Sequence, residues 1–302
     1  MITDTAFWLP NAGITLHGKR IRDGDGLPTL CLHGVLDNCA SFDALSHYLG
    51  DLDLIAIDLP GHGFSDPVPS TICDYLEYAS CVLELAHTQG WQRFQLIGHS
   101  LGGAVSSLVA GIHPDKIERL VLIDAIGPLS AEPPQTVSNV ARYVSTYLQG
   151  DRHPIYRSPI QAVKARVQLA DIVLETAELL VARDLKEVPG GYSWRHDVRL
   201  NRGLTTTLSE EQVLAFLANI AAPTLLVQAE RTALSESYYP RRINSVPKLH
   251  QLTLPGGHHL HMENPEPVAE AIRAFLATDP AVAAGRHSDA SRASGPCAAE
   301  TS

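Results

Sequence analysis

A serine lies at the centre of Gly98-His99-Ser100-Leu101-Gly102, between an apolar run at residues 94–97 and small residues at helical spacing from 104 to 110. This order predicts a strand, a sharp turn and a helix, with the serine at the turn. Glycines on both sides suit such a reversal, because side chains there would collide. Free N–H groups at the start of the helix would face an oxyanion formed at the serine. The pattern favours Ser100 as a nucleophile, although Gly/Ser clusters also mark ordinary loops.

Histidine is the side chain best suited to activate a serine, because its pKa lies near neutrality. The chain has fourteen histidines, so their positions must decide among them. His258 follows two glycines after the last predicted strand, on a loop at the carboxyl edge of the sheet, and is the favoured base. His259 and His261 are the alternatives. No metal site is expected in this cluster, which lacks the i, i+4 spacing or the carboxylates typical of such sites.

A second loop offers the hydrogen-bond donors that a tetrahedral oxyanion needs. The segment His33-Gly34-Val35 follows an apolar run and therefore lies at the same sheet edge as the serine. Gly34 allows the chain to turn, so that the N–H of Val35 can face the N–H of Leu101 across the site. Taken alone, this segment would be an ordinary turn after a strand. Beside Ser100 and the histidine it predicts an oxyanion hole.

These motifs in combination resemble the α/β-hydrolase superfamily, and within it the serine hydrolase-like proteins. The resemblance covers about residues 12–277. Its residues are His33-Gly34-Val35-Leu36-Asp37-Asn38, Asp58-Leu59-Pro60-Gly61-His62-Gly63-Phe64-Ser65, Gly98-His99-Ser100-Leu101-Gly102-Gly103, Gly190-Gly191-Tyr192-Ser193-Trp194-Arg195 and Gly257-His258. It implies a nucleophile at Ser100, a base at His258 and amide donors at Val35 and Leu101.

The position of the acid that would orient the histidine differs from the family pattern. Many relatives carry an aspartate just after the penultimate strand, where this chain has Thr232. Asp124, directly after the apolar run 120–123, is the best replacement, since a loop from either strand end can reach the histidine. Its alternative role is that of a turn or cap residue. Glu230 is the second candidate for the acid, although it could equally pair with Arg231 in solvent.

Four further residues are expected to contact the substrate: His33, Gly34, His99 and Trp194. His99 is adjacent to the nucleophile and either lines the pocket or packs against the sheet. Trp194, in the segment between the late strands, either contacts the substrate or anchors that segment to the core.

The elements that must position these residues alternate between apolar runs and helical patterns, which predicts a doubly wound, mostly parallel α/β sheet. Residues 1–128 and 222–277 form the predicted core, with two strands within 5–22 that turn or bulge at Gly13 and Gly18, and a short helix at 42–49. Residues 129–221 show helices and no strong strand, so we expect a helical lid inserted after the sixth strand. Residues 278–302 lack large apolar side chains, which predicts a disordered tail.

The composition disfavours some classes of binding partner and indicates a cellular location. A formal net charge of −10 over 302 residues disfavours nucleic acid and stable membrane association. Five cysteines, an odd number without a C-x-x-C pair, argue against a disulfide framework. No signal peptide or bilayer-spanning run is evident, so we expect a cytoplasmic protein. The oligomeric state is left open.

The sequence therefore predicts a serine hydrolase that cleaves a carboxylic ester or similar small acyl compound, with neither cofactor nor metal. Three alternatives stay open. The same three side chains could cleave a carbon–carbon bond or transfer an acyl group to an alcohol. A non-catalytic small-molecule binding protein on this scaffold is the third, favoured by the missing aspartate at Thr232.

Overall fold

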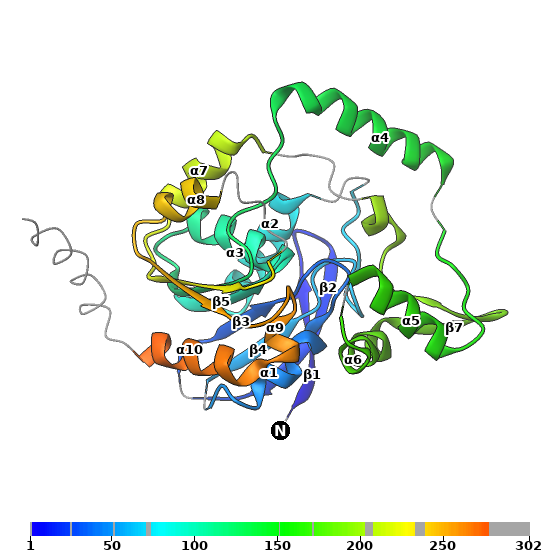
Figure 1. Cartoon of the computed structure of the whole chain (residues 1–302), viewed down its shortest axis with the longest axis horizontal. Helices are drawn as coiled ribbons and strands as arrows, with labels where there is room; N and C mark the ends of the chain where they lie inside the picture. The colour runs from blue at the N-terminus through cyan, green and yellow to red at the C-terminus, as the bar shows by residue number, and fades with distance from the viewer. Residues whose placement is uncertain are drawn as a thin grey trace, which may run out of the picture.

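An eight-stranded, mostly parallel sheet runs through the centre of the protein (Figure 1). Its strand order is β1-β2-β4-β3-β5-β6-β9-β10, and only the pairs β1/β2 and β2/β4 are antiparallel. The strands are β1 (Thr3–Leu9), β2 (Ile14–Arg22), β3 (Thr29–Leu32), β4 (Leu54–Ile57), β5 (Phe94–His99), β6 (Ile117–Ile123), β9 (Thr224–Ala229) and β10 (Leu249–Leu254). This computed structural model describes residues 2–24, 26–50, 52–70, 74–150, 152–170, 172–202, 208–232 and 239–277.

Helices cover both faces of the sheet, as the alternation of elements predicts. One face carries α2 (Tyr75–Thr88), α3 (Leu101–Ile112), α7 (Glu210–Ala218) and α8 (Tyr239–Ser245); the other carries α1 (Asp43–Ser46), α9 (Leu260–Glu263) and α10 (Pro265–Ala277) (Figure 1). Consecutive strand residues therefore enter different cores: Leu96 packs in one cluster and Ile97 in the other. Burial on both faces explains why the inner strands β3, β4, β5, β6 and β9 are rich in apolar residues.

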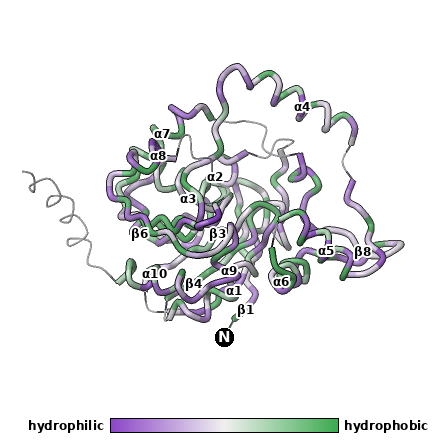
Figure 2. Tube along the Cα trace, viewed as in Figure 1, coloured by the Kyte–Doolittle hydropathy of each residue, from purple (hydrophilic) through white to green (hydrophobic). Residues whose placement is uncertain are grey.

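The chain between β6 and β9 leaves the sheet and forms a mainly helical segment. It contains the 3-10 helix η2 (Pro133–Gln135), α4 (Thr136–Gln149), α5 (Pro159–Ala170), α6 (Leu174–Asp184), β7 (Leu185–Val188), β8 (Gly191–Trp194) and the 3-10 helix η3 (Val198–Arg202), before α7 returns to pack on α3. Helices α5 and α6 share a small apolar core with Met262 of α9. In contrast, α4 stands away from the body and exposes apolar side chains such as Val137 and Leu148 (Figures 1 and 2).

Buried polar contacts fasten α5 and α6 to the loops beyond β3 and β4. The Arg166 guanidinium of α5 pairs with the buried carboxylate of Asp37. Arg183 of α6 donates to both oxygens of Asp58, at 3.1 and 3.0 Å. Removing one member of such a pair leaves a buried charge without its partner, which is strongly destabilising. These two helices are thus fixed to the core at the carboxyl edge of the sheet.

Several local predictions were wrong. Residues 185–194 form an antiparallel hairpin where no strand was expected, turned by Gly190 with a φ of +94°. The helix predicted at 42–49 is shorter in the structure: the 3-10 helix η1 (Cys39–Phe42) comes first, and α1 covers only Asp43–Ser46. Gly18 lies inside β2, where a side chain would collide with the backbone of Ala56 on β4, whereas Gly13 makes a turn as expected. The predicted tail, 278–302, lies outside the described residues.

Within the described ranges, no helix is both long enough and apolar enough to cross a bilayer.

Candidate active site

Ser100 occupies a strained turn between β5 and α3. Its backbone has φ +51° and ψ −114°, in a region that a residue with a side chain rarely adopts. Among the described residues, three that are not glycine have a positive φ: Leu36, Ser100 and Asp124. They follow β3, β5 and β6, which are neighbours in the sheet. Backbone strain is thus concentrated at one stretch of the carboxyl edge, as is common at functional sites.

The glycines around Ser100 are required by close packing. A side chain at Gly98 would collide with the carbonyl group of Gly102, and one at Gly102 would collide with that of Leu32 on β3. The Gly102 N–H donates to the carbonyl of His33 at 2.9 Å, which joins α3 to the loop after β3. Sequence reasoning anticipated the collision within the turn, and the structure adds the approach to β3.

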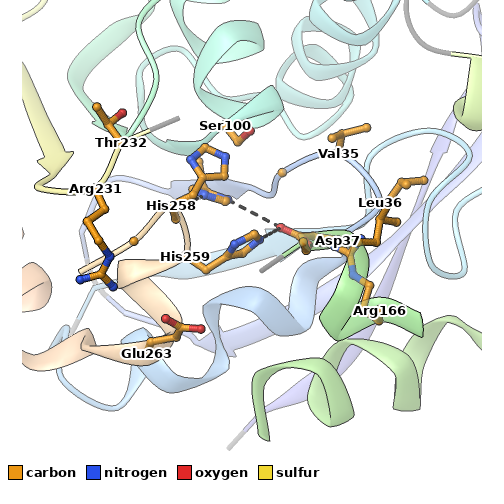
Figure 3. A pocket seen from close by; sticks show the side chains of 15 residues that line it. Val35, Leu36, Asp37, Ser100, Arg166, Arg231, Thr232, His258, His259 and Glu263 are labelled. Atoms are coloured by element: carbon orange, nitrogen blue, oxygen red, sulfur yellow. Dashed lines mark hydrogen bonds and ion pairs between the residues drawn. The ribbon is translucent and has the colours of Figure 1, made fainter. Parts of the chain in front are cut away.

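His258 is held by Asp124. Nδ1 of His258 lies 2.7 Å from Oδ2 of Asp124, and the other carboxylate oxygen accepts the Ala229 N–H at 3.0 Å. The Asp124 carboxylate is fully buried, whereas the His258 side chain is 26% exposed. A proton on Nδ1 that is donated to Asp124 leaves Nε2 as an acceptor. His258 and Ser100 line the same cavity and lie next to one another in the view of Figure 3.

The alternative acid lies elsewhere. Glu230 is exposed at the end of β9, and its N–H donates to the carbonyl of Leu254 at 3.0 Å. Thr232, at the position of the family aspartate, lines the cavity. Of the two carboxylates considered from the sequence, the structure brings Asp124 to the imidazole.

The loop after β3 faces the start of α3. Val35 lines the cavity and is 51% exposed, whereas Leu101 is buried as the first residue of α3. The first four N–H groups of a helix have no intrahelical acceptor, so the Leu101 N–H is free of the helix ladder. The bond from Gly102 to His33 keeps the two loops together. The two segments that carry Val35 and Leu101 therefore lie beside one another, and the role of their amides as an oxyanion hole stays a prediction.

A cavity of about 520 Å³ contains Ser100 and His258 (Figure 3). This volume suits a small organic ligand. The lining residues are Gly34, Val35, Leu36, Asp37, His99, Ser100, Arg166, Leu169, Ala170, Arg231, Thr232, Gly257, His258, His259 and Glu263. Its wall combines apolar side chains with ionic groups of both signs.

A cluster of histidines around one carboxylate forms the inner wall of this cavity. His99 is fully buried; burial, opposed by Asp37, lowers its pKa to about 4, so the ring is neutral at pH 7. Burial also holds the pKa of His261 well below its usual range. Burial by itself would raise the pKa of Asp37, but His259, His99 and Arg166 hold it well below the ordinary value. Asp37 is therefore a carboxylate at neutral pH.

Two of the predicted substrate contacts lie away from the cavity. His33 is fully buried: Nδ1 is 2.7 Å from the carbonyl of Gly34, and Nε2 accepts the Leu59 N–H at 2.9 Å. Both ring nitrogens are used inside the protein, so His33 shapes the loop. Trp194 packs against Tyr156 and His196 within the β8 region. Neither residue is among those that line the cavity, and their contact with a substrate stays a prediction. Gly34 and His99 do line the cavity.

Sequence reasoning missed four ionic residues of the wall: Asp37, Arg166, Arg231 and Glu263. Asp37 was part of the segment that carried the family resemblance, yet nothing near it in the sequence marks it as a pocket residue. Arg166 reaches the site from α5, 129 positions away from the carboxylate that it contacts. Only the three-dimensional packing brings these charges together.

Comparison with known proteins decides the family. A family model described as alpha/beta hydrolase fold matches residues 28–265. The chain belongs to the α/β-hydrolase family. The serine hydrolase-like protein of Danio rerio is 31% identical over 286 residues, which cover 89% of this chain and 87% of that protein. Membership of this hydrolase family, with serine hydrolase-like relatives, supports hydrolase activity.

Solved structures agree on the α/β-hydrolase fold. A hypothetical protein from Pseudomonas aeruginosa PAO1 has 36% sequence identity and a TM-score of 0.85, over 91% of this chain and 99% of that one. The thioesterase domain from the curacin biosynthetic pathway has a TM-score of 0.78 and 22% identity, over 90% of this chain and 99% of that domain. At 22% identity, the similarity to the thioesterase domain shows the fold alone.

Proposed function

We propose that this hydrolase cleaves a carboxylic ester or a similar acyl compound through an acyl-enzyme intermediate. The observation that carries the proposal is the 2.7 Å contact between Nδ1 of His258 and Oδ2 of Asp124, in the cavity that also contains Ser100. A buried carboxylate fixes the imidazole so that Nε2 is available as a base.

In the proposed reaction, Oγ of Ser100 attacks the substrate carbonyl carbon while Nε2 of His258 takes the hydroxyl proton. The amides of Val35 and Leu101 stabilise the resulting oxyanion. When the tetrahedral intermediate collapses, His258 returns the proton to the departing alcohol, leaving an ester on Ser100. Water then attacks this ester with His258 again as base, which releases the acid and restores the serine. Asp124 stabilises the histidine in its charged form throughout.

The surroundings of Ser100 favour a small substrate. The cavity volume of about 520 Å³ accommodates a drug-sized molecule but not a folded macromolecule. Val35, Leu36 and Leu169 offer apolar contacts near the serine. The steps above use only side chains and backbone amides of this chain, so the proposal needs neither a cofactor nor a metal.

The first experiment is labelling with a fluorophosphonate probe, which reports an activated serine. We expect rapid labelling of the wild type, none with Ser100→Ala and much slower labelling with Asp124→Asn. A panel of esters, followed by mass spectrometry of the trapped acyl-enzyme, would then test the bond type. A folded wild type that does not label would refute the proposal. If the products instead show cleavage of a carbon–carbon bond or transfer of the acyl group to an alcohol, that reaction takes the place of ester hydrolysis in the proposal.

A further inference from the structure

Three side chains of the inner wall converge on one point beside the proposed base. Asp37, His99 and His259 each offer one ligand atom, and these three atoms lie within 4.8 Å of one another. Oδ2 of Asp37 is 3.4 Å from Nε2 of His259 and 3.7 Å from Nδ1 of His99 (Figure 3). The three come from different elements: the loop after β3, the end of β5 and the loop before α9.

Two of these atoms, Nδ1 of His99 and Oδ2 of Asp37, face each other at 3.7 Å and form no hydrogen bond within the described residues. Nε2 of His99 lies 2.8 Å from the carbonyl oxygen of His258, so it must carry the hydrogen of the neutral ring. Nδ1 then presents a lone pair toward the carboxylate of Asp37. Within the described ranges, neither Nδ1 of His99 nor Oδ2 of Asp37 has a hydrogen-bond partner. Both residues are at most 2% exposed, and two buried acceptors in this position call for a cation.

We propose that Asp37, His99 and His259 bind a divalent transition-metal ion of the zinc class. Two imidazoles and one carboxylate form a ligand set that zinc uses in proteins. Tetrahedral bonds of about 2.0–2.2 Å place neighbouring ligand atoms roughly 3.3–3.6 Å apart. The observed separations of 3.4 and 3.7 Å are therefore close to those of a bound ion.

The surroundings also match those of a metal site. A metal-binding histidine usually donates its second N–H to a carbonyl or carboxylate, as His99 does to the carbonyl of His258. The second oxygen of Asp37 is held by Arg166, which fixes the carboxylate. Gly34 leaves room for this arrangement: a Cβ there would be 2.7 Å from Oδ2 of Asp37 and 2.9 Å from Nδ1 of His99. The positive charge of Arg166 weakens the attraction for a cation, so we expect reversible binding that a chelator removes.

The ion would inhibit the enzyme. All three ligands line the cavity, which leaves a fourth position open to water on that side. The rings of His99 and His258 have centroids only 4.7 Å apart. An ion on His99, with the ligand at its fourth position, therefore lies in the cavity beside His258 and obstructs the approach of a substrate to Ser100. This consequence depends on the proposed hydrolase mechanism, whereas metal binding itself does not.

The test measures zinc binding to the full chain by isothermal titration calorimetry, after EDTA treatment and alkylation of accessible cysteines. We expect one ion per chain, and binding at least about tenfold weaker in His259→Gln and in Asp37→Asn. His261→Gln is the matched control, because this buried histidine has its ring centroid 4.1 Å from that of His99 but is not one of the three ligands. His47→Gln, at an exposed position, controls for surface histidines. Circular dichroism verifies that each variant is folded.

Several results would overturn the site. These are a wild type that binds no zinc, ligand variants that bind as tightly as the wild type, or a control variant that loses binding equally. Cobalt supplies an independent readout, because a tetrahedral Co²⁺ site absorbs strongly in the visible and His259→Gln should lose that absorption.

Inhibition is measured separately, as the rate of fluorophosphonate labelling of Ser100 with zinc and after EDTA. We expect labelling at least about tenfold slower with zinc, and no such change in His259→Gln. Binding without slower labelling would refute the inhibitory role. If the metal-free protein does not label at all, the proposed hydrolase function fails, while calorimetry still decides the metal site.

Discussion

Replacing Asp124 by asparagine isolates the charge of the proposed acid with little disturbance of the fold. The backbone of Asp124 has φ +45°, a conformation that asparagine adopts about as readily as aspartate. The Ala229 N–H, 3.0 Å from Oδ1, requires an acceptor at that position. The new side chain must therefore turn its oxygen toward Ala229 and its NH₂ group toward His258. Asp124→Asn thus places a donor where Nδ1 now has an acceptor.

The size of the effect follows from this geometry. Faced with a donor, Nδ1 of His258 becomes an acceptor and the ring proton moves to Nε2, so the nitrogen proposed as the base can no longer take a proton. Loss of the correct tautomer in a Ser-His-Asp site lowers kcat by about 10⁴-fold, equivalent to about 5 kcal/mol of transition-state stabilisation at 1.36 kcal/mol per decade. We expect kcat/KM to fall by about 10³- to 10⁴-fold.

The assay is steady-state hydrolysis of the best ester found, together with the rate of fluorophosphonate labelling. Glu230→Gln and Thr232→Ala are the controls, and both should keep activity within about twofold of the wild type, because neither changes the group bonded to Nδ1. Thermal unfolding checks that Asp124→Asn is folded. A larger loss in Glu230→Gln than in Asp124→Asn would refute the assignment of the acid.

Three other perturbations test packing and buried charge. Gly102→Ala should be severely destabilised, by more than about 2 kcal/mol, because its Cβ would collide with the backbone of β3; an unchanged Tm would contradict this. Arg183→Met leaves the buried carboxylate of Asp58 without its partner and should cost about 3 kcal/mol in urea unfolding, whereas Arg241→Met, from an exposed pair, should leave the urea midpoint unchanged within experimental error. The free energy of unfolding should fall as the pH drops from about 6.5 to 4, by about 3 kcal/mol from His99 alone, because this ring binds a proton readily only after unfolding. Equal stability at pH 7 and pH 4.5 would be the contrary result.

Sequence patterns predicted the elements whose causes are local or periodic. Apolar runs marked β3, β5, β6 and β9, because each of these strands is buried on both faces and needs no polar alternation. The sharp turn at Ser100 was also visible, since flanking glycines are what a close reversal demands. The hairpin β7/β8 was missed because its strands have only four residues each and lie among helices.

Residues whose role depends on distant contacts could not be found in this way. In the sequence, Asp37 has the features of a loop residue. In the structure it is the centre of a buried cluster, because the fold brings His99, His259 and Arg166 to it from three other elements. For the same reason, the histidines near position 258 gave no indication of a metal site from the sequence. The carboxylate that completes the ligand set lies more than 200 positions earlier in the chain.

The position of the proposed acid shows how the sheet permits one residue to replace another. Strands β6 and β9 are adjacent and parallel, with Ile123 opposite Val227, so both end beside the His258 loop. Asp124 comes immediately after that pair, and its N–H donates to the carbonyl of Val227 at 2.8 Å. Thr232 lies five residues beyond Val227, at the far side of a turn. A carboxylate at either place can approach the same imidazole, but the one directly at the strand end is held by the sheet itself. Placing a carboxylate at the end of β6 therefore requires only a positive φ at residue 124, which aspartate tolerates.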